Sequence, residues 1–174
     1  MTGESYAKEV KTLAKDMKLL NMSQPGLTAL YSNAEKNVKG LEAERGKMQQ
    51  EYEKHVGTGS GGAMGLQKYY KTMEVQNAQN MADRYNAAKG DTQNMGKMLA
   101  GVQKVLNGGG PANKEDAARF AVDIDIAKSV AHNVTEMSVS PVSSISGKVE
   151  RDLTKIRKTI VDQYKLTKED IAKF

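Results

Sequence analysis

Apolar side chains recur at alternating steps of three and four residues through most of this chain, and that spacing places them on one face of an α-helix. The first such row consists of Tyr6, Val10, Leu13, Met17 and Leu20. A narrow apolar row of this kind, called a seam below, packs against other helices. The sequence therefore predicts an all-α fold, an elongated antiparallel helical bundle of four to six helices with coiled-coil-like seams.

Residues 1–56 carry two seams, separated by Pro25 and Gly26. Ser23 is a typical N-cap residue, and proline is tolerated in the first turn of a helix because its missing N–H has no partner there. We therefore expect a second helix to begin at Ser23, which makes residues 1–56 a helical hairpin. Both seams share one heptad frame, so a single helix kinked at Pro25 is the alternative. The second seam consists of Leu27, Tyr31, Ala34, Val38, Leu41, Arg45, Met48 and Tyr52.

Residues 57–65 read Gly-Thr-Gly-Ser-Gly-Gly-Ala-Met-Gly, which is flexible-linker chemistry between two helical segments. We interpret this stretch as an engineered Gly/Ser linker that marks a fusion, an excision or a circular permutation. Reading Phe174 directly into Thr2 gives a helix, a glycine-containing turn and a second helix, so permutation and fusion are favoured over excision. Residues 66–174 are predicted to form the bundle core, and residues 1–56 are expected to pack with it as one domain.

The segment after the linker predicts a long helix over residues 66–107, in which the seam changes frame between Met73 and Tyr85. A break of this helix near Gly90 is a further expectation, and Asn107-Gly108-Gly109-Gly110-Pro111 should end it. The expected seam consists of Leu66, Tyr70, Met73, Met81, Tyr85, Ala88, Met95, Leu99, Val102 and Leu106.

The remaining segments predict two further helices and a short terminal one. Asn113 is the expected N-cap of a helix that reaches about Met137, and its two apolar faces indicate a central position. Residues 138–146 are rich in serine and interrupted by a proline, so we expect an extended connector whose apolar side chains cover the core. A helix from about Val149 to Lys165 follows, and Thr167 with Asp170 should cap a final helix.

Residue types that carry catalysis or bind metals are scarce. Cysteine is absent, and His55 and His132 are the two histidines, so a usual zinc site would need carboxylates. Asp123 and Asp125 stand two apart on a helix and point away from each other, which argues against a shared proton. Phosphate-binding and nucleophile motifs are lacking as well. We therefore expect no catalytic residue, no cofactor or metal, and no small-molecule substrate.

Lysine and arginine recur at helical spacing on the first and last main helices, and they form a ridge on each. The net charge is +5, with 26 basic and 21 acidic side chains. Two such ridges fit nucleic-acid phosphates or an anionic membrane, although no aromatic residues interleave them for base stacking. The competing interpretation is a solvated face with ion pairs such as Lys148 with Asp152 and Lys158 with Asp162. The candidate polyanion contacts are Lys148, Arg151, Lys155, Lys158, Lys165, Lys8, Lys11, Lys15 and Lys18.

Two further observations bear on partners and location. The stretch from Met73 to Met98 is rich in methionine, glutamine and asparagine, which favours an adaptable surface for a protein partner. No apolar run reaches the length of a membrane span, and the first residues lack the features of a signal peptide. The sequence predicts a soluble chain and leaves its compartment open.

These features together favour a role in binding or assembly over enzymatic catalysis. In composition the chain resembles helical assembly proteins of bacteria and viruses, but no motif identifies a family. The prediction is a non-enzymatic structural or protein–protein interaction module, in which seam residues that are not buried internally contact a partner or another copy. The alternative is polyanion binding through the lysine ridges.

Overall fold

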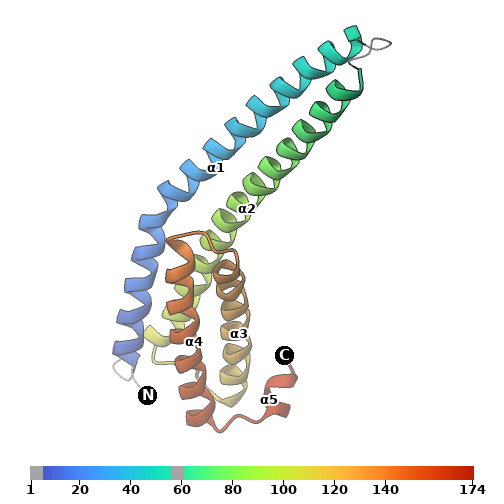
Figure 1. Ribbon diagram of the computed structural model, residues 1–174. Helices are drawn as coiled ribbons and strands as arrows, with labels where there is room; N and C mark the ends of the chain where they lie inside the picture. Colours follow the sequence, from blue (N-terminus) through green and yellow to red (C-terminus); the bar gives the residue numbers. More distant parts are fainter. Residues whose placement is uncertain (1–5, 56–60) are drawn as a thin grey trace. The chain divides into compact units, whose positions relative to one another are not determined.

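The computed structural model describes residues 6–55 and 61–174, and within these residues it contains five α-helices and no strand. They are α1 (Ala7–His55), α2 (Gly61–Asn107), α3 (Lys114–Glu136), α4 (Val142–Tyr164) and α5 (Lys168–Ala172), shown in Figure 1. The helices pack against one another, which confirms the all-α helical bundle predicted from the seams.

The chain divides into two compact units. The first, unit 1, consists of residues 1–24 and 88–174, and the second, unit 2, consists of residues 25–87. Helices α1 and α2 contribute one part to each unit. The prediction that the parts on either side of the linker pack as one domain stays a prediction.

The core of unit 1 lies among α1, α2, α3 and α4. Helices α3 and α4 run antiparallel and side by side, and an ion pair between Arg157 and Asp125 joins them with an N–O distance of 2.7 Å. The side chain of Asn113 accepts a hydrogen bond of 2.8 Å from the backbone N–H of Asp116, so α3 begins at the predicted cap. The largest buried side chains include Leu13, Leu20, Met95, Leu99, Leu106, Ile124, Val134, Leu153 and Ile160.

The turn after α2 is closed around a buried aromatic side chain. Tyr6 is buried, and its hydroxyl donates a hydrogen bond to the side-chain oxygen of Gln163 on α4. Gly110 has a φ of +90°, and a Cβ at that position would lie 2.7 Å from the Tyr6 ring. Tyr164 donates a hydrogen bond to the carbonyl oxygen of Pro111. Glycine is required at residue 110 for both its backbone conformation and the space that the ring occupies.

Unit 2 is an antiparallel pair formed by the second half of α1 and the first half of α2. Lys71 on α2 lies 2.9 Å from the carboxylate of Glu44 on α1. Its core is narrow, because its central cluster contains Val38, Ala78 and Ala82 with Ala34 and Leu41 partly buried beside them. Small side chains let the two helices approach closely, but they remove little apolar surface from water.

The prediction of a new helix at Ser23 is wrong, because α1 is one helix from Ala7 to His55 with Pro25 inside it. The Ser23 hydroxyl donates to the carbonyl of Leu20 instead of capping a helix. The alternative, a single helix through Pro25, is the one observed. A continuous helix keeps Leu20 and Leu27 in one heptad frame and buries both, and this offsets the backbone hydrogen bond that proline removes.

Helix α2 is also longer than predicted. It begins at Gly61, so residues 61–65 of the predicted linker are helical, and it passes through Gly90 without the expected break. A glycine within a helix costs only about 1 kcal/mol relative to alanine, and packing of the flanking buried residues Ala88 and Met95 offsets that cost. Residues 57–60 of the predicted linker lie outside the described residues, and its engineered origin stays a prediction.

Two expectations for the second half of the chain need correction. The connector of residues 138–146 is extended only in part, because α4 already begins at Val142; its apolar residues Val139, Val142 and Ile145 are buried as predicted. Helix α3 is not enclosed on two faces, since Ile126 on its second face is 48% exposed. The predicted cap of the last helix is confirmed, because Thr167 and Asp170 form a reciprocal capping box.

The core assignment predicts a large difference between two isoleucines of α3. Ile124→Ala should lower the free energy of unfolding by roughly 2 to 4 kcal/mol, because Ile124 is fully buried and truncation leaves a cavity. Leu153→Ala on α4 should behave alike, whereas Ile126→Ala, the matched control, should change stability by less than about 1 kcal/mol. Chemical denaturation measures all three, and equal effects at residues 124 and 126 would contradict the assignment.

Candidate interaction surfaces

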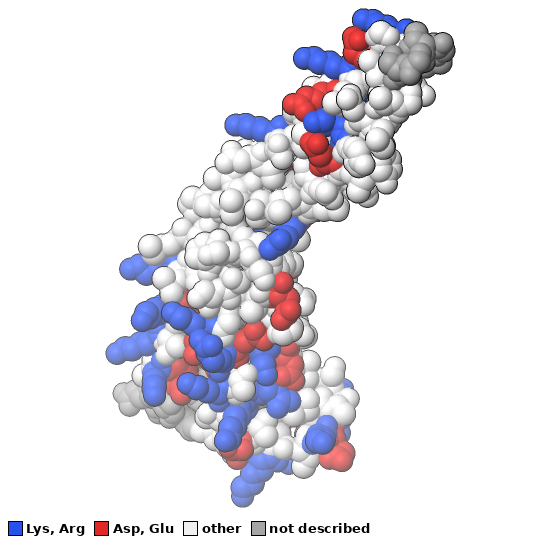
Figure 2. Space-filling view, in the orientation of Figure 1, with Lys and Arg blue, Asp and Glu red and all other residues white. Residues whose placement is uncertain are grey.

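The structure brings the two predicted lysine ridges next to each other. All nine candidate residues are exposed, and α1 and α4 are neighbours in unit 1, where Tyr6 bonds to Gln163 and the Asp16 and Asp152 carboxyl groups meet. Figure 2 shows lysine and arginine side chains gathered over this part of the chain. The name basic face is used below for Lys8, Lys11, Lys15 and Lys18 on α1 with Lys148, Arg151, Lys155 and Lys158 on α4.

Contacts between the ridges occur at two points along α1 and α4. Lys8 and Lys155 line one small pocket of about 120 Å³, which the acidic residues Glu9 and Asp152 also line, together with Thr12 and Ile156. Lys15 and Lys148 both lie close enough to Asp16 to act on its charge. The ninth predicted contact, Lys165, is not part of the basic face. It follows the last residue of α4 and has a left-handed backbone conformation, with a φ of 51°.

Acids lie near the basic face, since Glu9 and Asp152 line the pocket of Lys8 and Lys155, but close ion pairs are not formed among the described residues. Within residues 6–55 and 61–174, none of the nine predicted contacts forms an ion pair with a carboxylate at 4.0 Å or less. The pairs Lys148 with Asp152 and Lys158 with Asp162, which a solvated face would favour, are therefore not formed. The positive charge of the face is directed to solvent.

Two carboxyl groups that the sequence analysis missed meet between α1 and α4. Asp16 is only 4% exposed, and its carboxyl group lies beside that of Asp152. Burial raises the pKa of Asp16 from 3.8 to about 7, and the neighbouring carboxyl group of Asp152 adds to this, while Lys148 and Lys15 act in the opposite direction. Asp16 stands three residues after Leu13 and four before Leu20, so seam spacing was the signal for its burial.

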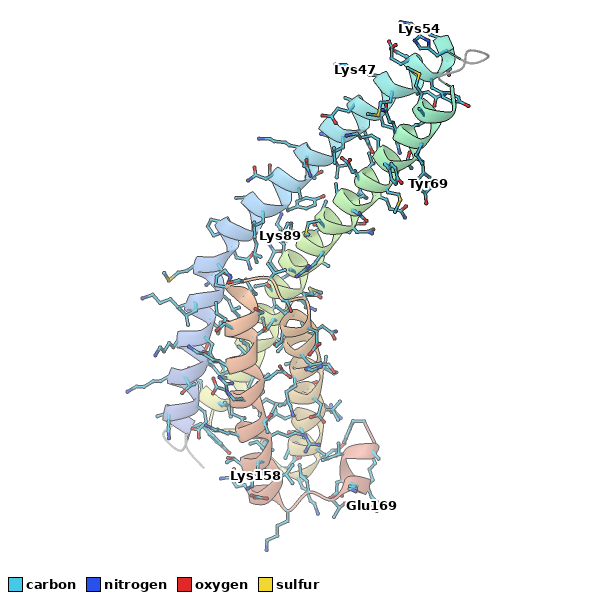
Figure 3. The ribbon with its side chains drawn as sticks, viewed as in Figure 1. Lys47, Lys54, Tyr69, Lys89, Lys158 and Glu169 are labelled. Atoms are coloured by element: carbon cyan, nitrogen blue, oxygen red, sulfur yellow. The ribbon has the colours of Figure 1, made fainter. Side chains whose placement is uncertain are left out.

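A second surface is apolar and lies on α2 in unit 2. Among the described residues eight large hydrophobic side chains are exposed, and five of them belong to this one segment. Their spacing of three, four and eight residues places them on one side of the helix. In Figure 3 the labelled side chain of Tyr69 points away from α1. The name α2 outer face is used below for Leu66, Tyr69, Tyr70, Met73 and Met81.

The α2 outer face corrects the predicted seam. The sequence analysis expected Leu66, Tyr70, Met73 and Met81 to pack inside the bundle, but these residues are exposed. The buried row on this part of α2 is instead Val75, Ala78 and Ala82, on the opposite side of the helix. From Ala88 to Leu106 the predicted seam is buried and correct.

The Met73–Met98 stretch, which the sequence analysis interpreted as one adaptable surface, does not lie on a single surface. Met73 and Met81 are exposed on the α2 outer face, whereas Met95 is fully buried in unit 1. Met98 lines a groove of about 330 Å³ between α2 and α3, together with Phe120 and Ile126. Only the first part of the stretch therefore belongs to the α2 outer face.

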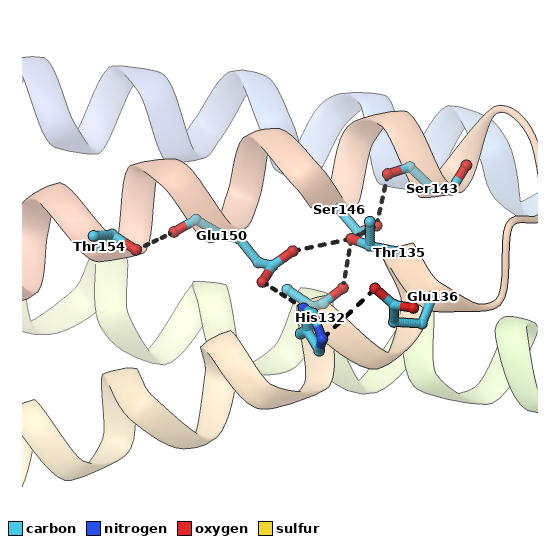
Figure 4. Close-up of polar contacts among 8 residues, drawn as sticks. His132, Thr135, Glu136, Ser143, Ser146, Glu150 and Thr154 are labelled. Atoms are coloured by element: carbon cyan, nitrogen blue, oxygen red, sulfur yellow. Dashed lines mark hydrogen bonds and ion pairs between the residues drawn. The ribbon is translucent and has the colours of Figure 1, made fainter.

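Both histidines take part in ordinary surface contacts. On α3, His132 Nδ1 lies 3.0 Å from Glu150 of α4, and Nε2 lies 3.7 Å from Glu136. The same carboxylate of Glu150 accepts a hydrogen bond from Thr135, whose hydroxyl also contacts Ser146 (Figure 4). This polar network joins α3 to α4. Among the described residues, no group of three or more potential metal ligands of the His, Cys, Asp or Glu type comes together.

Comparisons with known proteins add no family to this description. No protein-family model matches the chain, and no curated protein and no solved structure matches it either. None of the helices formed by the described residues is both long enough and apolar enough to cross a membrane.

The Asp16–Asp152 pair predicts a pH-dependent stability. Because the pKa of Asp16 is raised in the folded chain, this residue favours folding most at low pH, and that contribution is lost as the pH rises from about 4 to about 7. Asp16→Asn stays neutral throughout. The variant should therefore gain stability over the parent chain across this range, by an amount of order 2 to 4 kcal/mol, and level off above it.

Chemical denaturation at a series of pH values measures this difference. Asp162→Asn is the control, because Asp162 is an exposed aspartate on α4, the helix that carries Asp152, and the variant should follow the parent chain at every pH. Parallel curves for Asp16→Asn and the parent chain would contradict the raised pKa of Asp16.

Proposed function

We propose that this chain is a non-enzymatic interaction module that binds a protein partner through helix–helix contacts at the α2 outer face. The observation that supports the proposal is the gathering of five exposed large hydrophobic side chains on one side of one helix segment. Isolated exposed apolar residues are normal on a protein surface, whereas a continuous exposed patch marks an interaction site.

The packing of unit 2 also supports this proposal. Its inner face uses valine and alanine, while the larger leucine, tyrosine and methionine side chains of α2 point outward. Burying a large apolar side chain contributes roughly 1.5 to 3 kcal/mol. The exposed side chains of the α2 outer face therefore offer a partner apolar surface that unit 2 does not use itself. Tyrosine and methionine are also common at protein interfaces.

Photo-crosslinking in the organism that encodes the chain tests the proposal. Replacing Tyr69 with p-benzoylphenylalanine should give protein adducts, because Tyr69 is 59% exposed within the α2 outer face. Adding Met73→Glu should remove these adducts, since an unpaired charge in an apolar interface weakens binding by at least about tenfold.

The control carries the same photoreactive residue at Met22, which is 68% exposed but lies outside the α2 outer face. Adducts at residue 69 that Met73→Glu leaves unchanged, or the same adducts at residues 22 and 69, would contradict the proposal. Circular dichroism and the thermal midpoint of each variant establish that the helices remain folded.

Polyanion binding by the basic face is a second candidate function. The specific observation that favours it is the meeting of two ridges. Lys8 and Lys155 line one pocket, and although Glu9 and Asp152 line it too, no described carboxylate lies within 4.0 Å of the bases. A row of unpaired lysines releases counterions when it contacts phosphates, and this makes binding strongly dependent on salt.

A triple variant tests this second function without touching the core. Lys148→Gln, Lys155→Gln and Lys158→Gln together should weaken binding to duplex DNA or to phosphatidylserine vesicles. For duplex DNA the slope of log affinity against log salt should shrink by roughly 2 to 3, because three phosphate contacts are lost.

The control for charge alone replaces three exposed lysines of unit 2 with glutamine, namely Lys36, Lys39 and Lys47. This triple removes the same charge away from the basic face and should have a much smaller effect on the slope. Equal effects of the two triples would show a general charge effect, and the basic face would then not be a binding site.

A further inference from the structure

Two carboxyl groups lie between the two helices that carry the basic face. Asp16 belongs to α1 and Asp152 to α4, and the two carboxyl groups lie beside each other. Lys15 and Lys148, one from each ridge, lie close enough to Asp16 to act on its charge. An anion bound to these two lysines is therefore held close to the carboxyl pair.

The pair also borders the pocket of the basic face. Asp152 lines the pocket of about 120 Å³ together with Lys8, Lys155 and Glu9. A phosphate that reaches this pocket meets two ammonium groups and two acids. Its affinity therefore depends on how much negative charge the neighbouring carboxyl groups carry.

Asp16 is poorly placed to carry a negative charge. It is 4% exposed, and its Oδ2 atom is buried and has no hydrogen-bond partner among the described residues. An ionised carboxylate in this position loses its hydration, and no hydrogen bond to Oδ2 replaces it. A charge on Asp152 opposes a second negative charge beside it. Burial has the largest effect and raises the pKa of Asp16 to about 7, so its proton is gained or lost near neutral pH.

The charges that act most strongly on Asp16 come from α1 and α4 themselves. Lys15 and Lys148 favour ionisation of Asp16, and Asp152 opposes it. Helix α2 also packs on this part of α1, where Lys97 lines a groove with Met17 and Leu20, but Lys97 is not among the groups that shift the pKa of Asp16. The two helices that carry the basic face therefore also govern the protonation of Asp16.

Resting on the second candidate function, polyanion binding, we propose that the Asp16–Asp152 pair regulates the basic face, which binds a polyanion tightly while the pair holds a proton and weakly after the proton is lost to solvent. Binding and protonation are linked, so a bound polyanion also holds the proton on Asp16 more firmly. A unit charge about 10 Å from a bound phosphate changes the affinity by roughly three- to tenfold at the effective dielectric constant of a protein surface.

Binding of duplex DNA at low salt, measured by fluorescence anisotropy from about pH 6 to about pH 8.5, tests the proposal. The Kd of the parent chain should rise roughly three- to tenfold across this range, because Asp16 becomes charged. Asp16→Asn stays neutral, so its Kd should equal that of the parent chain at the acidic end and change less than about twofold. Asp162→Asn, which removes an exposed carboxylate of α4, should keep the pH dependence of the parent chain.

A second variant and a count of protons separate regulation from a change in packing. Asp152→Asn removes the charge that opposes ionisation of Asp16, so the rise in Kd should move to lower pH. Calorimetry in two buffers of different ionisation enthalpy measures the protons taken up on binding. Near neutral pH the parent chain should take up about 0.3 to 0.5 proton per site more than Asp16→Asn does. Equal proton uptake by the two proteins would overturn the proposal.

The outcomes separate this inference from the function on which it rests. DNA binding that the triple variant of Lys148, Lys155 and Lys158 weakens, with the same pH dependence in the parent chain and in Asp16→Asn, would overturn the regulation and keep polyanion binding. Loss of the pH dependence in Asp162→Asn as well would overturn the regulation, because the effect would be one of general charge. A chain that binds neither duplex DNA nor phosphatidylserine vesicles at any pH would overturn both.

Discussion

The packing of one apolar row on α2 supports both compact units. Its members lie on a single side of the helix, at steps of three, four, six or seven residues, and side-chain size changes along it. Alanine and valine occupy its first part, so unit 2 has a narrow core, whereas methionine and leucine occupy its second part, so unit 1 has a full one. The buried members of the row are Val75, Ala78, Ala82, Ala88, Met95, Leu99, Val102 and Leu106.

Periodicity predicted most of the fold because a helix with one apolar face has only one way to bury it. The seam of α4 is correct for this reason. The caps at Asn113 and Thr167 are correct because these side chains accept hydrogen bonds from backbone N–H groups at a helix start. Reasoning from periodicity failed where α2 has two apolar faces. Hydrophobicity alone favours Leu66 and Met73 over Val75 and Ala78, but α1 packs on the smaller side chains, which allow a close approach. Which face is buried depends on the partner helix, and a single segment does not contain that information.

The exposure of each lysine ridge could be predicted from the sequence, but the meeting of the two ridges could not. Exposure of the basic residues follows from their position opposite a seam, so each ridge was correctly placed in solvent. The meeting of the ridges, and of Asp16 with Asp152, depends on α1 lying next to α4, which spacing within either helix does not determine. Local sequence signals also gave a wrong prediction at Pro25. The residues there are typical of a helix start, but burial of apolar residues on both sides of Pro25 favours one continuous helix.

The two surfaces use opposite physical chemistry, and they lie in different units of the chain. Contacts made by the basic face are electrostatic and weaken as salt screens them, with a Debye length of about 8 Å at physiological ionic strength. Contacts made by the α2 outer face bury uncharged side chains, and added salt should weaken them little. The two proposals therefore predict different responses to salt, because rising salt should release a polyanion from the basic face and should weaken an apolar contact at the α2 outer face little.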